Sequence, residues 1–420
     1  MTKERSHFVQ IGATRDGMDP YLNAARERDM RAVLVETPDY VRWRKALGRR
    51  EFDITLEVEK PTDPSALVAA INELPEIPAL ILPGFERYVA PAYAAAHALA
   101  VRPSGMGEDF VPPYKAAQRA ALNGVDGVHQ PRFRRLSSLT EMAVAARELS
   151  YPMVVKPNDG GGSLGVLLIG DADGLRVACE ALTGLNNFDG GAFDGWMVEE
   201  YVEGDEFSVQ GVVREGHVTI LTVCEKIIAT EPLRDGTAVW GFRETGHVAG
   251  PGALADIDMV QFTRTCLAAV GYRHGPFHVD LMRKADQMHL LEMGFRLSGF
   301  RVADLVTRVS GIDWGDEAFR ALLDEPQGRI DDTVRYVGHL SARRPVELHN
   351  AAALAASGLR VEIQRIEPPA LPDEWRMGVP ASLSSDLMRH AGALGRLVVT
   401  GPSSGAVRMF LENCREAGND

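Results

Sequence analysis

The chain has 420 residues, of which 45% are hydrophobic and 25% are charged, a composition typical of a globular protein with two or three domains. No apolar run approaches the length of a membrane-spanning helix, and the first residues lack the apolar stretch of a signal peptide. The net charge of −13 argues against nucleic acid or an anionic membrane as the main partner. The four scattered cysteines are expected to stay reduced, which favours a cytoplasmic location.

The first part of the chain alternates short apolar runs with helical patterns. The apolar runs are His7–Ile11, Arg31–Val35 and Ala79–Pro83, and the helical patterns are Pro20–Arg28 and Ala90–Leu99. Such alternation predicts a parallel, doubly wound α/β sheet, which we place in residues 1–112 because two prolines follow directly.

The middle of the chain, residues 113–325, is rich in strand-like segments joined by short turns, which predicts antiparallel hairpins in an α+β region. The strand-like segments are Tyr151–Lys156, Trp196–Tyr201, Phe207–Val213, His217–Val223, Phe277–Met282 and Met288–Met293, with helical patterns at Leu139–Leu149 and Asp256–Val270. Residues 326–420 are expected to form a small C-terminal domain, with strands near Tyr336–His339 and Gly395–Val399.

One feature that could bind a ligand is a strand that ends in a lysine and runs into a glycine-rich loop. The lysine is Lys156, and the loop spans Asn158–Gly165. Glycines allow backbone N–H groups to turn toward a polyphosphate, and the lysine supplies a positive charge beside it. Neither a P-loop nor a complete G-x-G-x-x-G motif after a strand is present. The alternative is a flexible hairpin loop beside a lysine that reaches solvent.

A second feature is an acidic strand and turn some forty residues further on. The backbone of Glu200–Val202 could pair with an adenine edge, and Glu206 could accept hydrogen bonds from ribose hydroxyls. A solvated acidic hairpin is the alternative interpretation.

A third feature is a pair of carboxylates on two strands that flank a turn near Asp286. In a hairpin of this register Asp280 lies opposite Glu292, with Cβ atoms about 5 Å apart, and Arg296 follows on the same face. Two adjacent carboxylates favour a cation, and Mg²⁺ is typically held by one or two carboxylates together with phosphates. The alternative is an ordinary hairpin on which one carboxylate is protonated or exposed to solvent.

These three features, in this order, resemble the ATP-grasp superfamily, and the resemblance covers Lys115 to Ser310. It implies an ATP-grasp fold, in which an N-terminal α/β domain precedes a nucleotide-binding region with a lid subdomain, here near residues 150–204. Lys115 resembles the first nucleotide lysine of the family and Lys156 the second.

The resemblance also implies roles for the other residues of the three features. The glycine-rich loop resembles the flexible lid over the triphosphate, the strand end resembles the adenine hinge, and Arg296 resembles the arginine that steadies the acyl phosphate. The implied ATP ligands are Lys115, Lys156, Gly161, Gly162, Ser163, Gly165, Glu199, Glu200, Tyr201, Val202 and Glu206; the implied metal ligands are Asp280 and Glu292; and the implied catalytic residues are Arg296 and Lys156.

One position departs from the family pattern. The family's last motif usually reads Glu-x-Asn-x-Arg, whereas this chain has Gly294 between Glu292 and Arg296. The asparagine that commonly helps to hold a second Mg²⁺ is therefore missing, and the resemblance leaves open whether one or two ions bind. In the predicted register His278 lies opposite Gly294 and could fill the space.

The segment that contains Glu244 and His247 narrows the resemblance to one group of enzymes within the superfamily. A Glu-x-x-His step followed by proline resembles the L-amino acid ligases, typified by bacilysin synthetase, and carnosine-synthase-like enzymes. The resemblance implies that Glu244 and His247 lie near the amino-acid substrate together with Arg296, Gly299 and Phe300, and that Phe300 limits the size of the substrate side chain. A polar loop packed against the sheet is the alternative for Glu244 and His247.

The resemblance implies an ATP- and Mg²⁺-dependent carboxylate–amine ligase that forms an amide or dipeptide bond through an acyl phosphate and releases ADP and phosphate. Its expected partners are a small carboxylic acid and an amino acid, in peptide or small-metabolite synthesis such as that of antibiotics, and the family is often dimeric. Three alternatives stay open: a carboxylase of the biotin-carboxylase type, a ligase that acts on a carrier protein, and a nucleotide-binding protein without turnover.

Overall fold

A computed structural model gives the structure of the chain. The structure describes residues 6–103, 106, 109–187, 190–252, 255–331, 335–354, 358–366, 375, 378–380, 383 and 393–416. None of the helices among these residues is both long and apolar enough to span a membrane.

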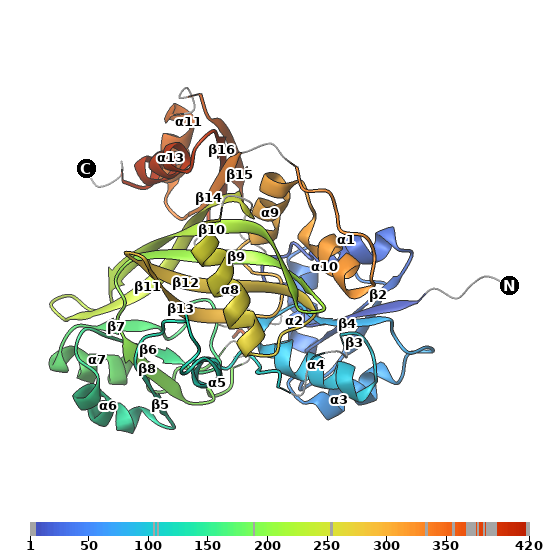
Figure 1. Ribbon diagram of the computed structural model, residues 1–420, viewed down its shortest axis with the longest axis horizontal. Coiled ribbons are helices and arrows are strands. Elements are labelled where there is room, and N and C mark those ends of the chain that lie inside the picture. Colours follow the sequence, from blue (N-terminus) through green and yellow to red (C-terminus); the bar gives the residue numbers. More distant parts are fainter. Residues whose placement is uncertain are drawn as a thin grey trace.

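The N-terminal part contains a four-stranded parallel sheet, as the alternating pattern predicts. The strands lie in the order β3-β2-β1-β4. Side chains that alternate along β1 enter two different cores, so Phe8 packs with α1 on one face while Val9 packs with α3 and α4 on the other. The sheet is therefore covered on both faces (Figure 1). The elements are β1 (His7–Ile11), α1 (Pro20–Glu27), β2 (Arg31–Glu36), α2 (Pro38–Ala46), β3 (Ile54–Glu57), α3 (Pro64–Ile71), β4 (Leu80–Pro83), η1 (Glu86–Tyr88) and α4 (Val89–Ala98).

Five long antiparallel strands form the centre of a second, twelve-stranded sheet, in the order β13-β12-β9-β10-β11. A tight turn at Glu215-Gly216 joins β9 to β10, and both residues have positive φ, as a two-residue hairpin loop of type I′ requires. Helix α8 covers one face of this sheet. The elements are β9 (Asp205–Arg214), β10 (His217–Pro232), β11 (Val239–Pro251), α8 (Ile257–Ala269), β12 (Gly275–Lys284) and β13 (Gln287–Gly294).

The strands of the glycine-rich region extend this sheet, because β7 pairs with β11 in the order β11-β7-β6-β8-β5. Helices α6 and α7 pack against these short strands around a core of their own. The elements are α5 (Lys115–Ala121), β5 (Phe133–Leu136), η2 (Leu139–Glu141), α6 (Met142–Glu148), β6 (Met153–Pro157), β7 (Leu167–Ile169), α7 (Ala172–Leu182) and β8 (Trp196–Glu200).

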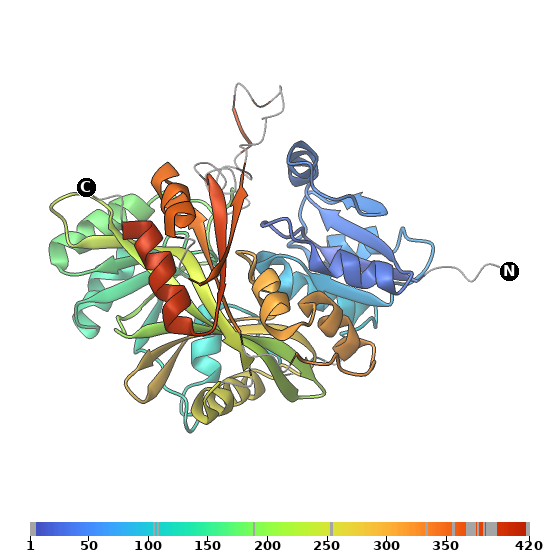
Figure 2. The same ribbon diagram turned by 90° about the horizontal axis from the view of Figure 1, so that it is seen from above.

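The C-terminal strands also join the large sheet, because β14 pairs with β11 on one side and with β16 on the other. The last helix, α13, packs with α11 and the new strands in a further core. In the second view this segment stands beside the central sheet and at a distance from the N-terminal strands (Figure 2). The elements are β14 (Tyr336–Ala342), α11 (Pro345–Leu354), β15 (Arg360–Arg365), β16 (Gly395–Gly401) and α13 (Ser404–Glu416).

Two helices hold the N-terminal sheet against the large sheet. Helices α9 (Val302–Ser310) and α10 (Trp314–Leu322) follow β13 and share a core with Phe8, Tyr21 and Val212. The indole of Trp314 is fully buried and donates a 2.9 Å hydrogen bond to the carbonyl of Gly211 on β9. Burial of these apolar side chains fixes the carboxyl ends of β1 and β4 beside the large sheet.

Candidate active site

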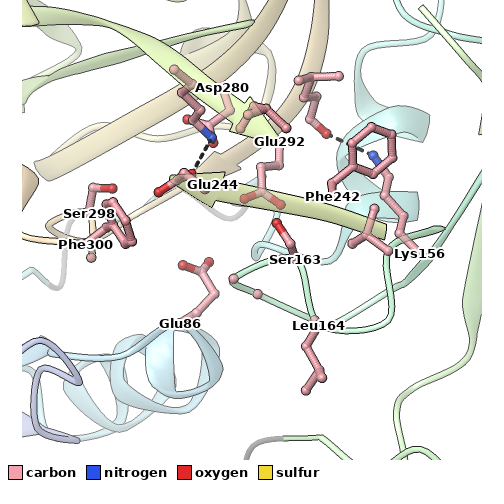
Figure 3. A pocket seen from close by; sticks show the side chains of 18 of the residues that line it. Glu86, Lys156, Ser163, Leu164, Phe242, Glu244, Asp280, Glu292, Ser298 and Phe300 are labelled. Atoms are coloured by element: carbon pink, nitrogen blue, oxygen red, sulfur yellow. Dashed lines mark hydrogen bonds and ion pairs between the residues drawn. The ribbon is translucent and has the colours of Figure 1, made fainter. Parts of the chain in front are cut away.

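A cavity of about 680 Å³ lies between the N-terminal parallel sheet and the large antiparallel sheet. All but one of the site residues that the sequence predicts line it, although they come from eight separate segments of the chain (Figure 3). The exception is Gly165, which packs against the ring of Pro157. The predicted residues in the cavity are Lys115, Lys156, Gly161, Gly162, Ser163, Glu199, Glu200, Tyr201, Val202, Glu206, Glu244, His247, Asp280, Glu292, Arg296, Gly299 and Phe300.

The N-terminal wall of the cavity lies where ligands collect in open α/β sheets. Chain connections run in opposite directions from β1 and β4, and the loops after these two adjacent strands contribute Asp16 and Glu86. The two strand ends approach closely at Gly12 and Gly84, since a Cβ on Gly84 would lie 2.1 Å from the carbonyl oxygen of Gly12. Glycine at position 84 is therefore needed to bring Glu86 into the cavity.

Lys115 connects α5 to both the glycine-rich loop and the carboxylate pair. It is the first residue of α5, its Nζ donates to the carbonyl of Gly160 at 2.5 Å, and it lies 2.9 Å from Oε2 of Glu292. This ammonium outweighs the effect of burial and holds the pKa of Glu292 well below its usual value. The carboxylate of Glu292 is therefore ionised at neutral pH.

Lys156 is buried at the end of β6, next to Glu199 on β8. Its ammonium forms an ion pair with Glu199, which Arg119 contacts from the other side at 3.0 Å. Burial lowers the pKa of Lys156 to about 8, with Glu199 opposing the shift. The side chain of Glu199 thus serves as the counter-ion of two cations and is turned away from solvent.

The predicted adenine hinge is only partly free to pair with a base. The amide of Glu200 donates to the carbonyl of Arg132 at 3.0 Å, and the amide of Tyr201 donates to the carbonyl of Pro152 at 3.3 Å. These two amides are therefore engaged by neighbouring segments, and pairing of the remaining backbone of Glu200–Val202 with an adenine edge stays a prediction.

The structure confirms that Asp280 on β12 pairs with Glu292 on β13. The register shifts by one residue directly after this pair, which is a β-bulge that the sequence did not predict. Ser208 donates to Oδ1 of Asp280 at 2.5 Å and thereby orients the carboxylate. The structure likewise places His278 opposite Gly294, as predicted.

Lys226 on β10 is the main residue that the sequence analysis missed. Its ammonium pairs with Asp280 and lies 2.9 Å from Glu206 and 3.4 Å from Glu244. Burial alone would lower the pKa of Lys226, but the three carboxylates raise it well above its usual value. The lysine therefore carries the positive charge that makes this group of carboxylates stable in the absence of ligand.

A β-bulge brings Glu244 and His247 to the same face of β11. Residues three apart on a regular strand point to opposite faces, but β11 carries an extra residue at Thr245, where its register against β10 shifts. The hydroxyl of Thr245 is buried and donates to the carbonyl of Ile227 at 2.8 Å. Glu244 Oε1 then lies 3.6 Å from Nε2 of His247.

Glu86 and Phe300 lie away from Lys156 in the cavity (Figure 3), and Arg296 lines the cavity beside Glu86. Arg296 pairs with Glu86 at 2.7 Å, and its buried Nε makes no hydrogen bond within the described part of the chain. Phe300 and Arg301 both have positive φ, which non-glycine residues adopt rarely, and the amide of Arg301 donates to Asp16 at 2.8 Å. This contact fixes the loop that carries Phe300 against the N-terminal sheet.

Some of the missed residues left a signal in the sequence and others did not. Glu86 directly follows a predicted parallel strand, so the rule that ligands collect at strand ends could have identified it. Lys226 and Arg119 lie inside a strand and a helix without any local motif, and only their partners on distant strands mark them.

Residues 149–304 match the family model of the ATP-grasp domain. An alanine–anticapsin ligase of Bacillus amyloliquefaciens is 24% identical over 330 residues, which cover 72% of this chain and 65% of that ligase. The chain thus spans less than two thirds of the length of this relative.

Two solved structures resemble the chain over nearly its whole length. An L-amino acid ligase from Bacillus licheniformis gives a TM-score of 0.67 at 18% identity, covering 99% of this chain and 98% of that one. N5-carboxyaminoimidazole synthetase from Staphylococcus aureus, complexed with ADP, also gives a TM-score of 0.67, at 14% identity and with 99% of both chains covered. At these identities the likeness establishes the fold. Residues 149–304 are therefore an ATP-grasp domain, within a chain that has the ATP-grasp fold.

Proposed function

We propose that the protein is an ATP-dependent carboxylate–amine ligase that activates a carboxylic acid as an acyl phosphate and joins it to an amino acid. The observation that supports this most strongly is that one cavity contains both a cation-rich end and a second end suited to an amino acid. Lys115 and Lys156 lie at the first end, and Glu244, Arg296 and Phe300 lie at the second.

The cation-rich end suits a nucleoside triphosphate. Lys115 and Lys156 would bind phosphate oxygens under the loop Gly160–Gly165, and Glu206 would accept from ribose hydroxyls. Of the hinge amides, that of Val202 is the one we assign to the adenine edge. Positioning and charge neutralisation are the main contributions a protein makes to phosphoryl transfer, and these side chains provide both.

Asp280 and Glu292 fit a magnesium ion that arrives with the nucleotide. They are adjacent oxygen ligands on paired strands, and no group of three or more Asp, Glu, His or Cys side chains within the described residues is placed to hold a metal alone. Mg²⁺ commonly takes one or two carboxylates and completes its shell with phosphates and water. When bound, the ion would neutralise charge on the phosphates.

In the proposed reaction, a carboxylate oxygen of the acid attacks the γ-phosphorus while the bond to the β-phosphate oxygen breaks, which releases ADP. The amine then attacks the acyl carbon, and phosphate leaves. Lys226 lies beside Asp280 and would hold the transferring phosphate, and the unpaired Nε–H of Arg296 would donate to the oxyanion of the tetrahedral adduct. Closure of the glycine-rich loop would exclude the water that hydrolyses acyl phosphates.

The amino-acid end of the cavity supports an amino acid as the amine. Glu244 provides a carboxylate for an ammonium group, and Phe300 limits the space for a side chain. The alanine–anticapsin ligase and the L-amino acid ligase that the chain resembles are named for reactions of this class.

A screen of ADP release with pairs of amino acids and small carboxylic acids, followed by mass spectrometry of the products, tests the proposal. We expect release that requires both partners and a product that has the summed mass less one water. Glu292→Gln should abolish the release without unfolding the protein, whereas Glu180→Gln should leave it intact, because Glu180 is an exposed carboxylate that pairs with Arg176.

The same screen distinguishes the alternatives. Release that requires bicarbonate would indicate a carboxylase, a reaction compatible with the fold of the synthetase from Staphylococcus aureus. Release that appears only after an acyl or aminoacyl carrier protein is added would indicate a carrier-dependent ligase. Tight ATP binding without release under any condition would contradict ligase activity.

A further inference from the structure

Two histidines and an arginine form a buried hydrogen-bonded chain that leads from the cavity into the C-terminal strands. His247 on β11 lies directly opposite His339 on β14, with Nδ1 of His247 2.9 Å from Nε2 of His339. Arg396 on β16 donates from Nε to Nδ1 of His339 at 2.9 Å. At the far end Asp304 accepts from Arg396 at 2.6 Å, and all three members of the chain are 5% exposed or less.

The chemistry of arginine fixes the direction of every hydrogen bond in this chain. A guanidinium nitrogen can only donate, so Nδ1 of His339 must accept and carries no proton. The single proton of neutral His339 is then on Nε2 and is donated to Nδ1 of His247. His247 consequently carries its own proton on Nε2, which faces Glu244 in the cavity at 3.6 Å.

The surroundings keep both imidazoles neutral and fixed in place. Burial, together with the positive charge of Lys226, lowers the pKa of His247 to about 3, and burial next to Arg396 lowers that of His339 well below its usual value. The ring of Phe300 packs against both, at centroid distances of 5.6 Å and 5.2 Å. A protonated imidazole at either position would place two donors face to face.

We propose that His339 and Arg396 are positioning residues, which make His247 a permanent hydrogen-bond donor toward Glu244 and prevent it from acting as a base. This rests on the proposed function, in which Glu244 receives the ammonium group of the substrate. Nδ1 of His247 already accepts from His339 and Nε2 already carries a proton, so the proton that the amine must lose cannot go to this imidazole. The C-terminal strands thereby set the chemistry of a residue in the ATP-grasp cavity.

The tautomers can be read without any substrate. Long-range ¹H–¹⁵N spectra of the ¹⁵N-histidine-labelled full chain, assigned with His247→Gln and His339→Gln, report which ring nitrogen carries the proton. We expect Nε2–H on both rings between about pH 6 and 8, the range in which an ordinary histidine titrates. His339→Leu should then convert His247 to a mixture of tautomers. Nδ1–H on His247 in the unmodified protein, or an unchanged His247 spectrum in His339→Leu, would overturn the proposal.

Kinetics test whether the chain matters for the reaction. His339→Leu and Arg396→Met should lower kcat/KM for the amino acid about 10- to 100-fold while KM for ATP stays the same, as is usual when the partner that orients a functional imidazole is lost. His339→Gln should recover most of the activity, because its amide can accept from Arg396 and donate to His247. His349→Gln, at an exposed site on α11, is the control.

The two proposals fail separately. If the protein releases no ADP, the ligase function is refuted. A tautomer shift of His247 in His339→Leu would still establish the hydrogen-bonded chain. Equal losses in His339→Gln and His339→Leu, with equal falls in melting temperature, would show that His339 only supports the packing of β14 and would refute its positioning role.

Discussion

The imidazole of His278 occupies the space that a side chain at position 294 would need. A Cβ built on Gly294 would lie 2.0 Å from Cε1 of His278, much closer than non-bonded atoms approach one another. The exchange of the family's usual asparagine for glycine is thus coupled to a histidine on the opposite strand. An asparagine at position 294 would therefore not fit beside His278 without a shift of the imidazole.

The coupling predicts that Gly294→Ala destabilises the protein by about 1–3 kcal/mol, the usual cost of overpacking a well-packed site. Gly241→Ala is the matched control, because Gly241 also lies on a strand that lines the cavity, yet a Cβ there meets nothing within 4 Å. Adding His278→Ala should remove most of the cost of Gly294→Ala. Urea unfolding of the single and double variants measures the coupling, and additive losses would contradict it.

The lowered pKa of Lys156 predicts that ATP affinity depends on pH. The ammonium loses its proton as the pH rises through about 8, so affinity should be constant well below pH 8 and fall above it. Titration calorimetry near pH 8 in buffers of different ionisation enthalpy should show proton uptake on binding. In Lys156→Arg the charge persists, and the affinity should be independent of pH up to about 10. An equal pH dependence in both proteins would assign the titration to another group.

Lys226 is expected to stabilise the carboxylates around it. The substitution Lys226→Met leaves the carboxylates of Glu206, Glu244 and Asp280 without their cation. We expect the free energy of unfolding to fall by about 3 kcal/mol at pH 8. This value is at the low end for a broken buried pair, because Glu206 and Glu244 are partly exposed. The loss should shrink toward pH 5, because burial raises the pKa of Glu206 and this carboxyl then takes up a proton. Lys284→Met, at an exposed position, is the control. Urea unfolding at pH 8 and pH 5 measures the loss of stability in Lys226→Met. A loss of equal size at both pH values would contradict the electrostatic account.

Phe300 should determine which amino acids fit. Phe300→Ala should admit larger apolar side chains. The transition-state free-energy difference between large and small substrates should shift by about 1–3 kcal/mol in favour of the large ones, because apolar pockets distinguish methylenes weakly. Phe300→Trp should restrict the enzyme to small partners. Substrate profiles of the two variants measure this, with melting temperatures as the control. An unchanged profile together with a large fall in melting temperature would make Phe300 a packing residue.

The parts of this structure that local pattern determines could be predicted from the sequence. Opposition of Asp280 and Glu292 follows from hairpin geometry over a few residues, and the parallel sheet follows from the alternation of strands and helices. Bulges could not be predicted, because the extra residue at Thr245 has no signature in a strand of ordinary composition.

Contacts between distant segments were equally out of reach. Lys226 pairs with Asp280, which is 54 residues away in the sequence, and His247 contacts His339, which is 92 residues away. No periodicity or motif links such positions. In one sequence, without related sequences to compare, only the assembled sheet reveals them.

Transfer of oxygen from the acid to phosphate tests the central claim most directly. Once an acid and amine pair is found, the acid labelled with ¹⁸O in its carboxylate is incubated with ATP, Mg²⁺ and the amine, and the released phosphate is analysed by mass spectrometry. An acyl phosphate intermediate predicts one ¹⁸O per phosphate, with ADP as the other product. Phosphate without ¹⁸O, or the label in AMP, would contradict activation of the carboxylate by the γ-phosphate.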